Sequence, residues 1–370
     1  MKDAIVNAYE VKGTLNYDKL INEFGLKPID EKLLSRIKEH TGDLHPMLRR
    51  GIFSAQRDLN FILDQYEKGN KFYLYTGIAP SGSMTIGHLV PFMFTKYLQD
   101  KFDVELIIQI PDEEKALMRN MSFEDVHKLA YEDALDIIAL GFDPKKTKIF
   151  FNTDYAKTLY PQAVRVAKHI TFSMVKDSFG FTNQTNIGSI FYTSMQAVPA
   201  FLKSVQEGKN IPCLITLAID QDVHFRIARD AIAKLGYYKP ATIECKFLPS
   251  LNGSPKMSSH STNDTIYLND SPEIVKKKVF SAFTGQQPTL ELQRKYGGDP
   301  DKCVVCQYNK FIFEPDDKKL KEIMDGERNG TLTAGEHKVD LTNKINAFLE
   351  DHNKKKEKLR DTLEKFIIRD

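Results

Sequence analysis

The stretch Lys71–Asp100, KFYLYTGIAPSGSMTIGHLVPFMFTKYLQD, decides the fold of this chain. Its first residues are aromatic and β-branched and stop at Gly77, which predicts a short strand over 72–76. A loop rich in glycine, serine and proline follows, and Thr85 is a favourable N-cap for a helix over about 86–99. The first turn of a helix offers free N–H groups and a positive dipole end, so this strand–loop–helix unit suits a bound phosphate.

Length and composition limit the number of domains and the kinds of function that the chain can have. The chain has 370 residues, of which 41% are hydrophobic, enough for two or three domains with real cores. Its formal net charge is +2. A protein that binds nucleic acid without specificity carries a general basic excess, so any RNA contact of this chain has to be local.

The sequence also bears on where the protein is located. No run of 18 apolar residues occurs, and the amino terminus, MKDAIVNAYE, lacks an apolar signal core, so we expect no membrane association and a cytoplasmic location.

The four cysteines, Cys213, Cys245, Cys303 and Cys306, fit reduced thiols. Cys303 and Cys306 have a zinc-like spacing, but further ligands are distant in sequence, so we expect neither zinc nor an iron–sulfur cluster.

Buried strands alternate with helices along the middle of the chain. The near-continuous apolar run Val104–Ile110 is typical of a parallel strand covered on both faces, and strands are also predicted over 147–151 and 213–219. A helix is predicted over 123–140. Acidic and amide side chains follow two of these strands, at the sheet edge where open α/β sheets bind ligands. The pattern predicts an α/β fold with a Rossmann-type, doubly wound parallel sheet.

The flanking regions are predicted to be helical. Residues 1–70 read as an N-terminal helical extension, with amphipathic runs over 17–24, 31–39 and 55–66. Residues 71–270 form the Rossmann-type domain, with an insertion at about 155–207 that contains a long helical stretch, 160–179, and is suited to a pocket or a dimer face. Residues 271–370 read as a C-terminal α-helical domain with helices over 275–283, 317–324, 334–349 and 354–366; its lysine clusters are candidate phosphate contacts.

Two short motifs carry a resemblance to a known enzyme class. Thr85–His88, T-I-G-H, resembles the "HIGH" signature of class I aminoacyl-tRNA synthetases, and Lys256–Ser259, K-M-S-S, resembles their "KMSKS" signature. Within that class the chain is most similar to the tryptophanyl-tRNA synthetases of eukaryotic and archaeal type. The similarity extends from about residue 17 to the end, through the runs LRRGIF (48–53), FYLYTG (72–77), FTKYLQD (94–100), DALDIIALGFDP (133–144), FGFT (179–182), AIDQD (218–222), FRIARD (225–230), KMS (256–258) and FIFEPDD (311–317).

The resemblance implies both an architecture and a reaction. It implies a Rossmann catalytic domain at 71–270, a helical anticodon-binding domain at 271–370 and a homodimer. It also implies that L-tryptophan and ATP, the latter with Mg²⁺, give tryptophanyl-adenylate and pyrophosphate, and that the tryptophan then passes to tRNA(Trp).

Site residues follow from the resemblance position by position. Tyr75 and Gln109 match residues that read the indole N–H, a role that Tyr and Gln can fill because both accept hydrogen bonds. Glu114, Gln196 and Gln221 match residues around the ammonium and carboxylate of the substrate. The ATP-binding set is Gly77, Pro80, Ser81, Thr85, Gly87, His88, Asp220, Lys256, Met257 and Ser258. Lys256 and His88 are the catalytic pair, acting by charge stabilisation with no protein nucleophile and no metal ligands.

Some residues depart from the family pattern, and three alternatives stay open. Thr85 replaces the first signature histidine, Ile78-Ala79 replace Arg-Gly, and His260 replaces the last serine. We still expect an active enzyme. The alternatives are a tyrosyl-tRNA synthetase, a nucleotidylyltransferase that uses no tRNA, and a non-catalytic paralogue that serves as a binding module.

Overall fold

The computed structural model describes residues 5–6, 11–13, 15–257 and 261–370. Its centre is a seven-stranded sheet in the order β3-β4-β9-β8-β5-β6-β7. The strands are β3 (Lys27–Pro28), β4 (Phe53–Arg57), β5 (Tyr73–Gly77), β6 (Glu105–Ile110), β7 (Thr147–Phe151), β8 (Cys213–Ala218) and β9 (Ala241–Cys245). The five strands from β9 to β7 are parallel, and β3 and β4 extend the β9 edge in antiparallel pairing. The predicted doubly wound α/β fold is confirmed.

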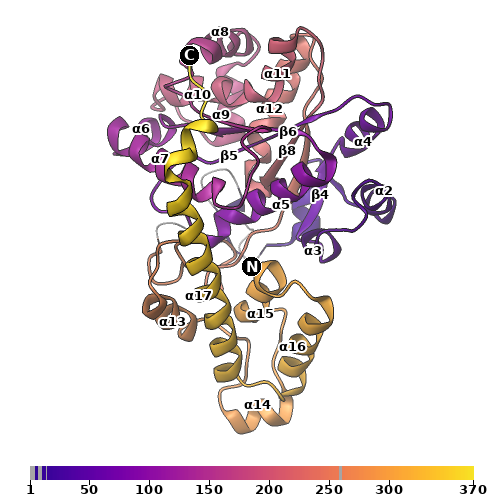
Figure 1. Ribbon diagram of the computed structural model, residues 1–370, viewed down its shortest axis with the longest axis vertical. Coiled ribbons are helices and arrows are strands. Elements are labelled where there is room, and N and C mark those ends of the chain that lie inside the picture. Colours follow the sequence, from indigo (N-terminus) through magenta and orange to yellow (C-terminus); the bar gives the residue numbers. More distant parts are fainter. Residues whose placement is uncertain (1–4, 7–10, 14, 258–260) are drawn as a thin grey trace.

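Helices surround the sheet and form the lower lobe seen in Figure 1. Residues 17–207 contain α1 (Tyr17–Glu23), α2 (Glu31–Thr41), α3 (Pro46–Arg49), α4 (Leu59–Glu67), α5 (Ile86–Phe102), α6 (Glu114–Met118), α7 (Phe123–Ile138), α8 (Ala156–Ala167), α9 (Phe172–Phe179), α10 (Ile187–Ala197) and α11 (Pro199–Glu207). Residues 219–365 contain η1 (Ile219–Gln221), α12 (Asp222–Lys234), α13 (Pro272–Phe280), α14 (Leu290–Tyr296), α15 (Val304–Tyr308), η2 (Asn309–Phe313), α16 (Asp317–Asn329), α17 (Ala334–Leu359) and η3 (Arg360–Lys365). A small hairpin, β1 (Ile5–Val6) with β2 (Val11–Lys12), precedes them.

Both faces of the parallel sheet are covered, as the apolar strands predict. Along β5 and β6, Leu74 and Ile108 belong to one buried cluster, whereas Tyr75 and Ile107 belong to another. Successive side chains of a strand point to opposite faces, so the two clusters lie on opposite faces of the sheet. None of the helices in the described part of the chain is both long enough and apolar enough to cross a membrane.

Three elements differ from their predicted form. The run predicted to be helical from residue 55 begins as strand β4, because its backbone pairs with β9; the sheet therefore extends upstream of residue 71. The stretch over 160–179 is two helices, since Thr171 caps a new helix by accepting a hydrogen bond from the Met174 N–H. The predicted helices 334–349 and 354–366 merge into the 26-residue α17, as no glycine or proline interrupts residues 350–353.

Helix α17 connects the lower lobe to the α/β body. Its first turn lies in the lobe, and its last turns run beside α7 (Figure 1). The chain end then joins the free edge of β7, where the Ile149 N–H donates to the Phe366 carbonyl and the Ile368 N–H donates to the Ile149 carbonyl, both at 2.9 Å. The last residues of the C-terminal region are therefore part of the α/β body.

Candidate active site

A cavity of about 470 Å³ opens at the carboxyl ends of the parallel strands. Strands β5 and β8 are neighbours there, although β6 and β7 follow β5 on one side and β9 follows β8 on the other. This reversal of strand order leaves a crevice between the loops, which is where doubly wound sheets bind ligands. Of the predicted site residues, the cavity is lined by Tyr75, Gly77, Ser81, Gly87, His88, Gln109, Glu114, Gln196, Asp220, Gln221, Lys256 and Met257.

A buried chain of polar groups runs across β5, β6 and the end of β7. The Tyr75 hydroxyl donates to Gln109 Oε1 at 2.6 Å, and Gln109 Nε2 donates to Asn152 Oδ1 at 2.9 Å. Asn152 Nδ2 in turn donates to Glu113 Oε1 at 2.6 Å. Burial raises the pKa of Glu113 to about 7. With its donor used, the Tyr75 hydroxyl offers only lone pairs to a ligand, and such an acceptor fits a ligand N–H.

Polar side chains that suit a ligand with both an ammonium and a carboxylate group lie around the same cavity. Glu114 is 4% exposed, and its Oε2 is 2.5 Å from the Lys115 ammonium. Gln196 Oε1 is buried and has no hydrogen-bond partner within the described residues. Gln221 Nε2 donates to Asp220 Oδ2 at 3.2 Å. Oxygen acceptors at Glu114 and Gln196 suit a ligand ammonium, and the Lys115 ammonium suits a ligand carboxylate.

His88 is held as a neutral donor by the start of helix α5. Thr85 and His88 form a capping box: the His88 N–H donates to Thr85 Oγ1 at 3.3 Å, and the Thr85 N–H donates to His88 Nδ1 at 3.2 Å. Because Nδ1 accepts, the ring proton sits on Nε2. Burial lowers the pKa of His88 to about 4, and Lys256 and Lys115 add to the shift. At neutral pH His88 therefore offers a neutral N–H to a ligand.

Lys256 reaches the cavity from the second signature. Its ammonium forms an ion pair with the Asp220 carboxylate and lies 5.2 Å from the centre of the Phe247 ring. Asp220 is 1% exposed, and its Oδ1 has no hydrogen-bond partner in the described part of the chain. Asp220 thus fixes the lysine beside the cavity while leaving one carboxylate oxygen available.

Backbone pairing joins the two signatures. The Ile86 N–H donates to the Ile266 carbonyl at 3.1 Å, and the Leu268 N–H donates to the Met84 carbonyl at 3.0 Å. A Cβ on Gly87 would lie 3.5 Å from the Met257 side chain, so Met257 packs on the first turn of α5. The structure therefore brings together two motifs that lie about 170 residues apart in the chain.

The loop after β5 depends on a glycine. A Cβ on Gly77 would lie 2.4 Å from the Gln109 carbonyl oxygen, which no side chain can accommodate without movement of the backbone. Pro80 and Thr85 are buried beside the cavity without lining it, so Thr85 acts on the site through its cap on His88. The predicted site residue Ser258, and His260, lie outside the described residues.

Several residues that line the cavity are absent from the predicted site residues: Lys115, Arg119, Tyr192, His224 and Phe225. His224 is 5% exposed, and burial lowers its pKa to about 3. Lys115 and His224 follow the strands β6 and β8 by a few residues, and this position in the sequence could have identified them as residues near the ligand-binding edge of the sheet. Arg119 and Tyr192 reach the cavity from α6 and α10, and no local pattern marks them.

Comparison with known proteins agrees with this geometry. A family model described as "tRNA synthetases class I (W and Y)" matches residues 67–350. A tryptophan–tRNA ligase of Sulfolobus acidocaldarius is 47% identical over 99% of this chain and 95% of its own length, and one of Pyrococcus abyssi is 48% identical over 99% and 94%. The crystal structure of Plasmodium falciparum tryptophanyl-tRNA synthetase superposes with a TM-score of 0.90 at 41% identity, over 95% of this chain and 97% of that one.

The relatives match almost end to end, so the agreement includes the helical C-terminal region as well as the sheet and its cavity. The resemblance inferred from the two signatures is confirmed. The chain belongs to the class I tRNA synthetases, and within them to the tryptophanyl-tRNA synthetases of archaeal and eukaryotic type.

Proposed function

We propose that this chain is a tryptophan–tRNA ligase, which activates L-tryptophan with ATP and transfers it to tRNA(Trp) in the cytoplasm. The observation that carries the proposal is the cavity, in which the phosphate-binding side chains of both signatures lie next to the buried Tyr75–Gln109 pair. The relatives named above carry the same activity in their names. The tyrosyl, nucleotidylyltransferase and non-catalytic alternatives are not favoured.

In the first step the tryptophan carboxylate attacks the α-phosphorus of ATP and pyrophosphate leaves. Tyr75 accepts the indole N–H, and Glu114 and Gln196 hold the ammonium. The Nε2–H of His88 and the ammonium of Lys256 meet the negative charge that grows on the phosphate oxygens and the leaving group. Mg²⁺ enters with ATP as part of that substrate. No side chain forms a bond with the substrate, so positioning and charge account for the catalysis.

The direct test is ATP–pyrophosphate exchange with each of the twenty amino acids. We expect exchange with tryptophan and far less with every other amino acid, tyrosine included. Preference for tyrosine would overturn the substrate assignment. No exchange with any amino acid, by a protein that still binds ATP, would favour the non-catalytic paralogue.

The catalytic role of Lys256 is tested by Lys256→Ala. Loss of a contact that stabilises transition-state charge costs about 2.7–4 kcal/mol, or roughly 10²–10³-fold in rate. We expect that loss in single-turnover adenylate formation, with little change in tryptophan affinity. Lys239→Ala is the matched control, because Lys239 is exposed and pairs with Asp230 at the surface. A rate for Lys256→Ala within about threefold of wild type would remove this lysine from the mechanism.

The C-terminal region is the proposed anticodon-binding domain. Its helix α14 has two exposed apolar side chains, Leu290 (57% exposed) and Tyr296 (63% exposed). Exposed aromatic side chains such as Tyr296 can stack on unpaired bases. Two members of the lysine clusters are already paired: Lys278 with Asp270 at 2.7 Å, and Lys356 with Asp136 at 2.9 Å. We therefore expect Tyr296→Ala to raise the KM for tRNA in aminoacylation and to leave pyrophosphate exchange unchanged. Ile274→Ala on α13 serves as the control, and equal effects of both would contradict the assignment.

We also propose a homodimer formed through the insertion at 155–207. Four apolar side chains are exposed there: Tyr160 (59%), Val164 (45%), Phe172 (39%) and Ile187 (83%). Several exposed apolar side chains within one segment are typical of an interface. Ile187→Asp should shift the protein from dimer to monomer in sedimentation velocity, whereas Ile274→Asp, at an exposed isoleucine on α13 (45%), should not. A wild-type monomer at micromolar concentration would contradict the proposal.

A further inference from the structure

Four side chains that can bind a metal meet inside the C-terminal lobe. Cys303 and Cys306 lie at the start of α15, Glu327 near the end of α16, and His337 in the first turn of α17 (Figure 1). One ligand atom from each lies within 4.8 Å of the others. All four are at most 1% exposed. The sequence argument set this pair aside because further ligands are distant along the chain. The fold brings two of them alongside, across a separation of more than twenty residues.

Glu327 is not fully satisfied by the protein. Its Oε2 accepts from Gln286 Nε2 at 2.9 Å and lies 3.2 Å from His337 Nδ1. Its Oε1 is buried and has no hydrogen-bond partner within the described residues. A buried carboxylate oxygen without a partner costs free energy, since nothing replaces the water it has lost. A cation among these four side chains would remove that cost.

The two thiols supply the remaining ligands in the same space. The sulfurs of Cys303 and Cys306 lie within 4.8 Å of the Glu327 and His337 ligand atoms, and both side chains are fully buried. A cysteine binds a metal as the thiolate, so two thiolates and a carboxylate would surround the ion and offset the charge of a divalent cation.

The donor set selects the metal. Two cysteine sulfurs, an imidazole nitrogen and a carboxylate oxygen suit Zn²⁺, whereas Mg²⁺ and Ca²⁺ prefer oxygen ligands alone. With bonds of 2.0–2.1 Å, nitrogen and oxygen ligands of one tetrahedral zinc lie about 3.3 Å apart. The observed separation of His337 Nδ1 and Glu327 Oε2 is 3.2 Å. An iron–sulfur cluster spreads its ligands over several iron atoms, so donors this close together fit one ion better.

The ring of His337 is held in place by the residues behind it. Its Nε2 lies 3.2 Å from Asn309 Nδ2, which also donates to the Val305 carbonyl at 3.2 Å, while Lys344 donates to Asn309 Oδ1. These contacts fix the ring with its Nδ1 toward Glu327.

We propose that Cys303, Cys306, Glu327 and His337 form a structural zinc site. Four protein ligands fill a tetrahedron and leave no position for a substrate, so the role of the ion is to hold the lobe together. It would join the start of α15, the end of α16 and the start of α17, three segments that are separate along the chain. This proposal is independent of the proposed function, because it rests on residues outside the active-site cavity.

The first test is the metal content of the full-length protein, purified without chelators from cells supplied with zinc. We expect about one zinc per chain by elemental mass spectrometry, since one set of four ligands binds one ion. Cobalt in place of zinc should give the visible absorption of a tetrahedral ion and a near-ultraviolet thiolate-to-cobalt band. Neither readout depends on enzyme activity.

The double variant Cys303→Ser/Cys306→Ser should lose the zinc and the thiolate band, and its thermal midpoint should fall. Cys213→Ser/Cys245→Ser removes the other two buried cysteines and should keep both the zinc and the band, so it controls for the loss of buried thiols. If the first variant does not fold, the zinc content and cobalt spectrum of the wild type decide the question. Wild-type protein without zinc, zinc retained by the Cys303/Cys306 variant, or iron with a visible charge-transfer band would each overturn the proposal.

Discussion

In the proposed function, Tyr75 and Gln109 provide the single polar contact that selects the substrate. Tryptophan has one polar atom in its side chain, and the buried Tyr75 hydroxyl can only accept from it once its own proton is given to Gln109 Oε1. Gln109 therefore orients the hydroxyl, and Asn152 orients Gln109. The pair acts as a unit, which means that a change at Gln109 alters what Tyr75 presents to the substrate.

Gln109→Leu tests that unit. Without the amide oxygen the Tyr75 hydroxyl keeps one acceptor, the Gln196 carbonyl at 3.1 Å. Its proton then turns away from position 109, and its lone pairs are no longer aimed at the indole N–H as before. We expect a loss of about 1–3 kcal/mol in kcat/KM for tryptophan, the range for a buried polar group that loses its partner, and a smaller loss for tyrosine. Pyrophosphate exchange with both amino acids gives the comparison. An unchanged preference would show that Gln109 does not select the substrate.

His88 is predicted to be neutral under working conditions. Its pKa in the folded protein is about 4, below its ordinary value of 6.5, mainly because of burial. The unfolded chain therefore binds more protons between these pH values, and stability falls as the pH drops from 6.5 toward 4. We expect the Nε2–H tautomer at pH 6 in the nitrogen–proton NMR spectrum of the imidazoles, with His88→Asn used to assign the signal. A protonated His88 ring at pH 6 would contradict the assignment.

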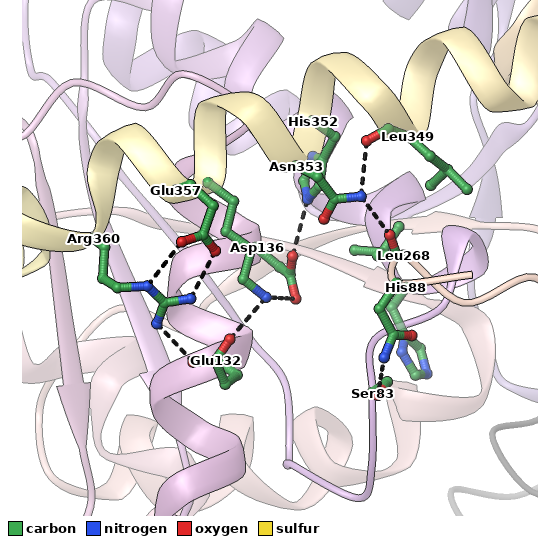
Figure 2. A network of polar contacts seen from close by, with 12 residues as sticks. Ser83, His88, Glu132, Asp136, Leu268, Leu349, His352, Asn353, Glu357 and Arg360 are labelled. Atoms are coloured by element: carbon green, nitrogen blue, oxygen red, sulfur yellow. Dashed lines mark hydrogen bonds and ion pairs between the residues drawn. The ribbon is translucent and has the colours of Figure 1, made fainter. Parts of the chain in front are cut away.

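At the scale of the element, α17 is the most informative part of the molecule. It begins at the proposed zinc ligands and ends against α7, where Figure 2 shows a polar network between the two helices. His352 Nε2 lies 3.0 Å from Asp136 Oδ1, and Lys356 donates to the other oxygen at 2.9 Å. Asn353 also donates to the Leu268 carbonyl at 2.9 Å. The next residue, Asn269, donates to Ser83 Oγ at 3.3 Å, so the network reaches the loop before the first signature.

The network should stabilise the junction more than a surface ion pair does. The side chains of Asp136 and Lys356 are 7% and 13% exposed, and Lys356→Met leaves the Asp136 carboxylate short of a partner. We expect a loss of about 1–3 kcal/mol in the free energy of unfolding, measured with urea. Lys354→Met on the same helix is the control, since Lys354 and Glu350 are both 67% exposed and such pairs contribute about 0.5 kcal/mol or less. Equal losses in the two variants would show that burial does not matter here.

At the scale of the whole molecule, the last part of the C-terminal hundred residues packs into the α/β body. Leu349, Leu363 and Phe366 are at most 4% exposed and belong to the same buried cluster as the sheet residues Leu106 and Ile108. The chain end also pairs with the free edge of β7. The catalytic body is therefore completed by residues from the far end of the sequence.

A chain that ends at Asp270 should consequently fail to fold as a soluble catalytic unit. Truncation exposes the apolar surface beneath α17 and leaves the backbone of β7 unpaired, a combination that favours aggregation. Circular dichroism and gel filtration of the truncated chain would test this. A monodisperse truncated protein that retains pyrophosphate exchange would contradict it and restore the simpler picture of two independent domains.

The sequence alone determined the elements whose cause is local. The strand–loop–helix unit of residues 71–100, the buried strands β6, β7 and β8, and the two signatures follow from periodicity, capping residues and short motifs, and the structure has them within a few residues of the predicted bounds. The predicted site residues meet in one cavity because parallel strands end at a common edge, and a sequence with alternating strands and helices already implies that edge.

Only the tertiary structure decided the features that depend on residues far apart in the chain. β4 is a strand because β9 lies beside it, although its own sequence is equally suited to a helix. The same holds for the charges and the candidate metal ligands. Burial in the folded protein keeps the ring of His88 neutral, and Lys278 and Lys356 find their acidic partners only there. Folding also brings Cys303 and Cys306 together with Glu327 and His337. The pKa of a side chain, and its ability to bind a metal, depend on the groups that surround it in the folded protein. Spacing along the chain does not reveal those groups.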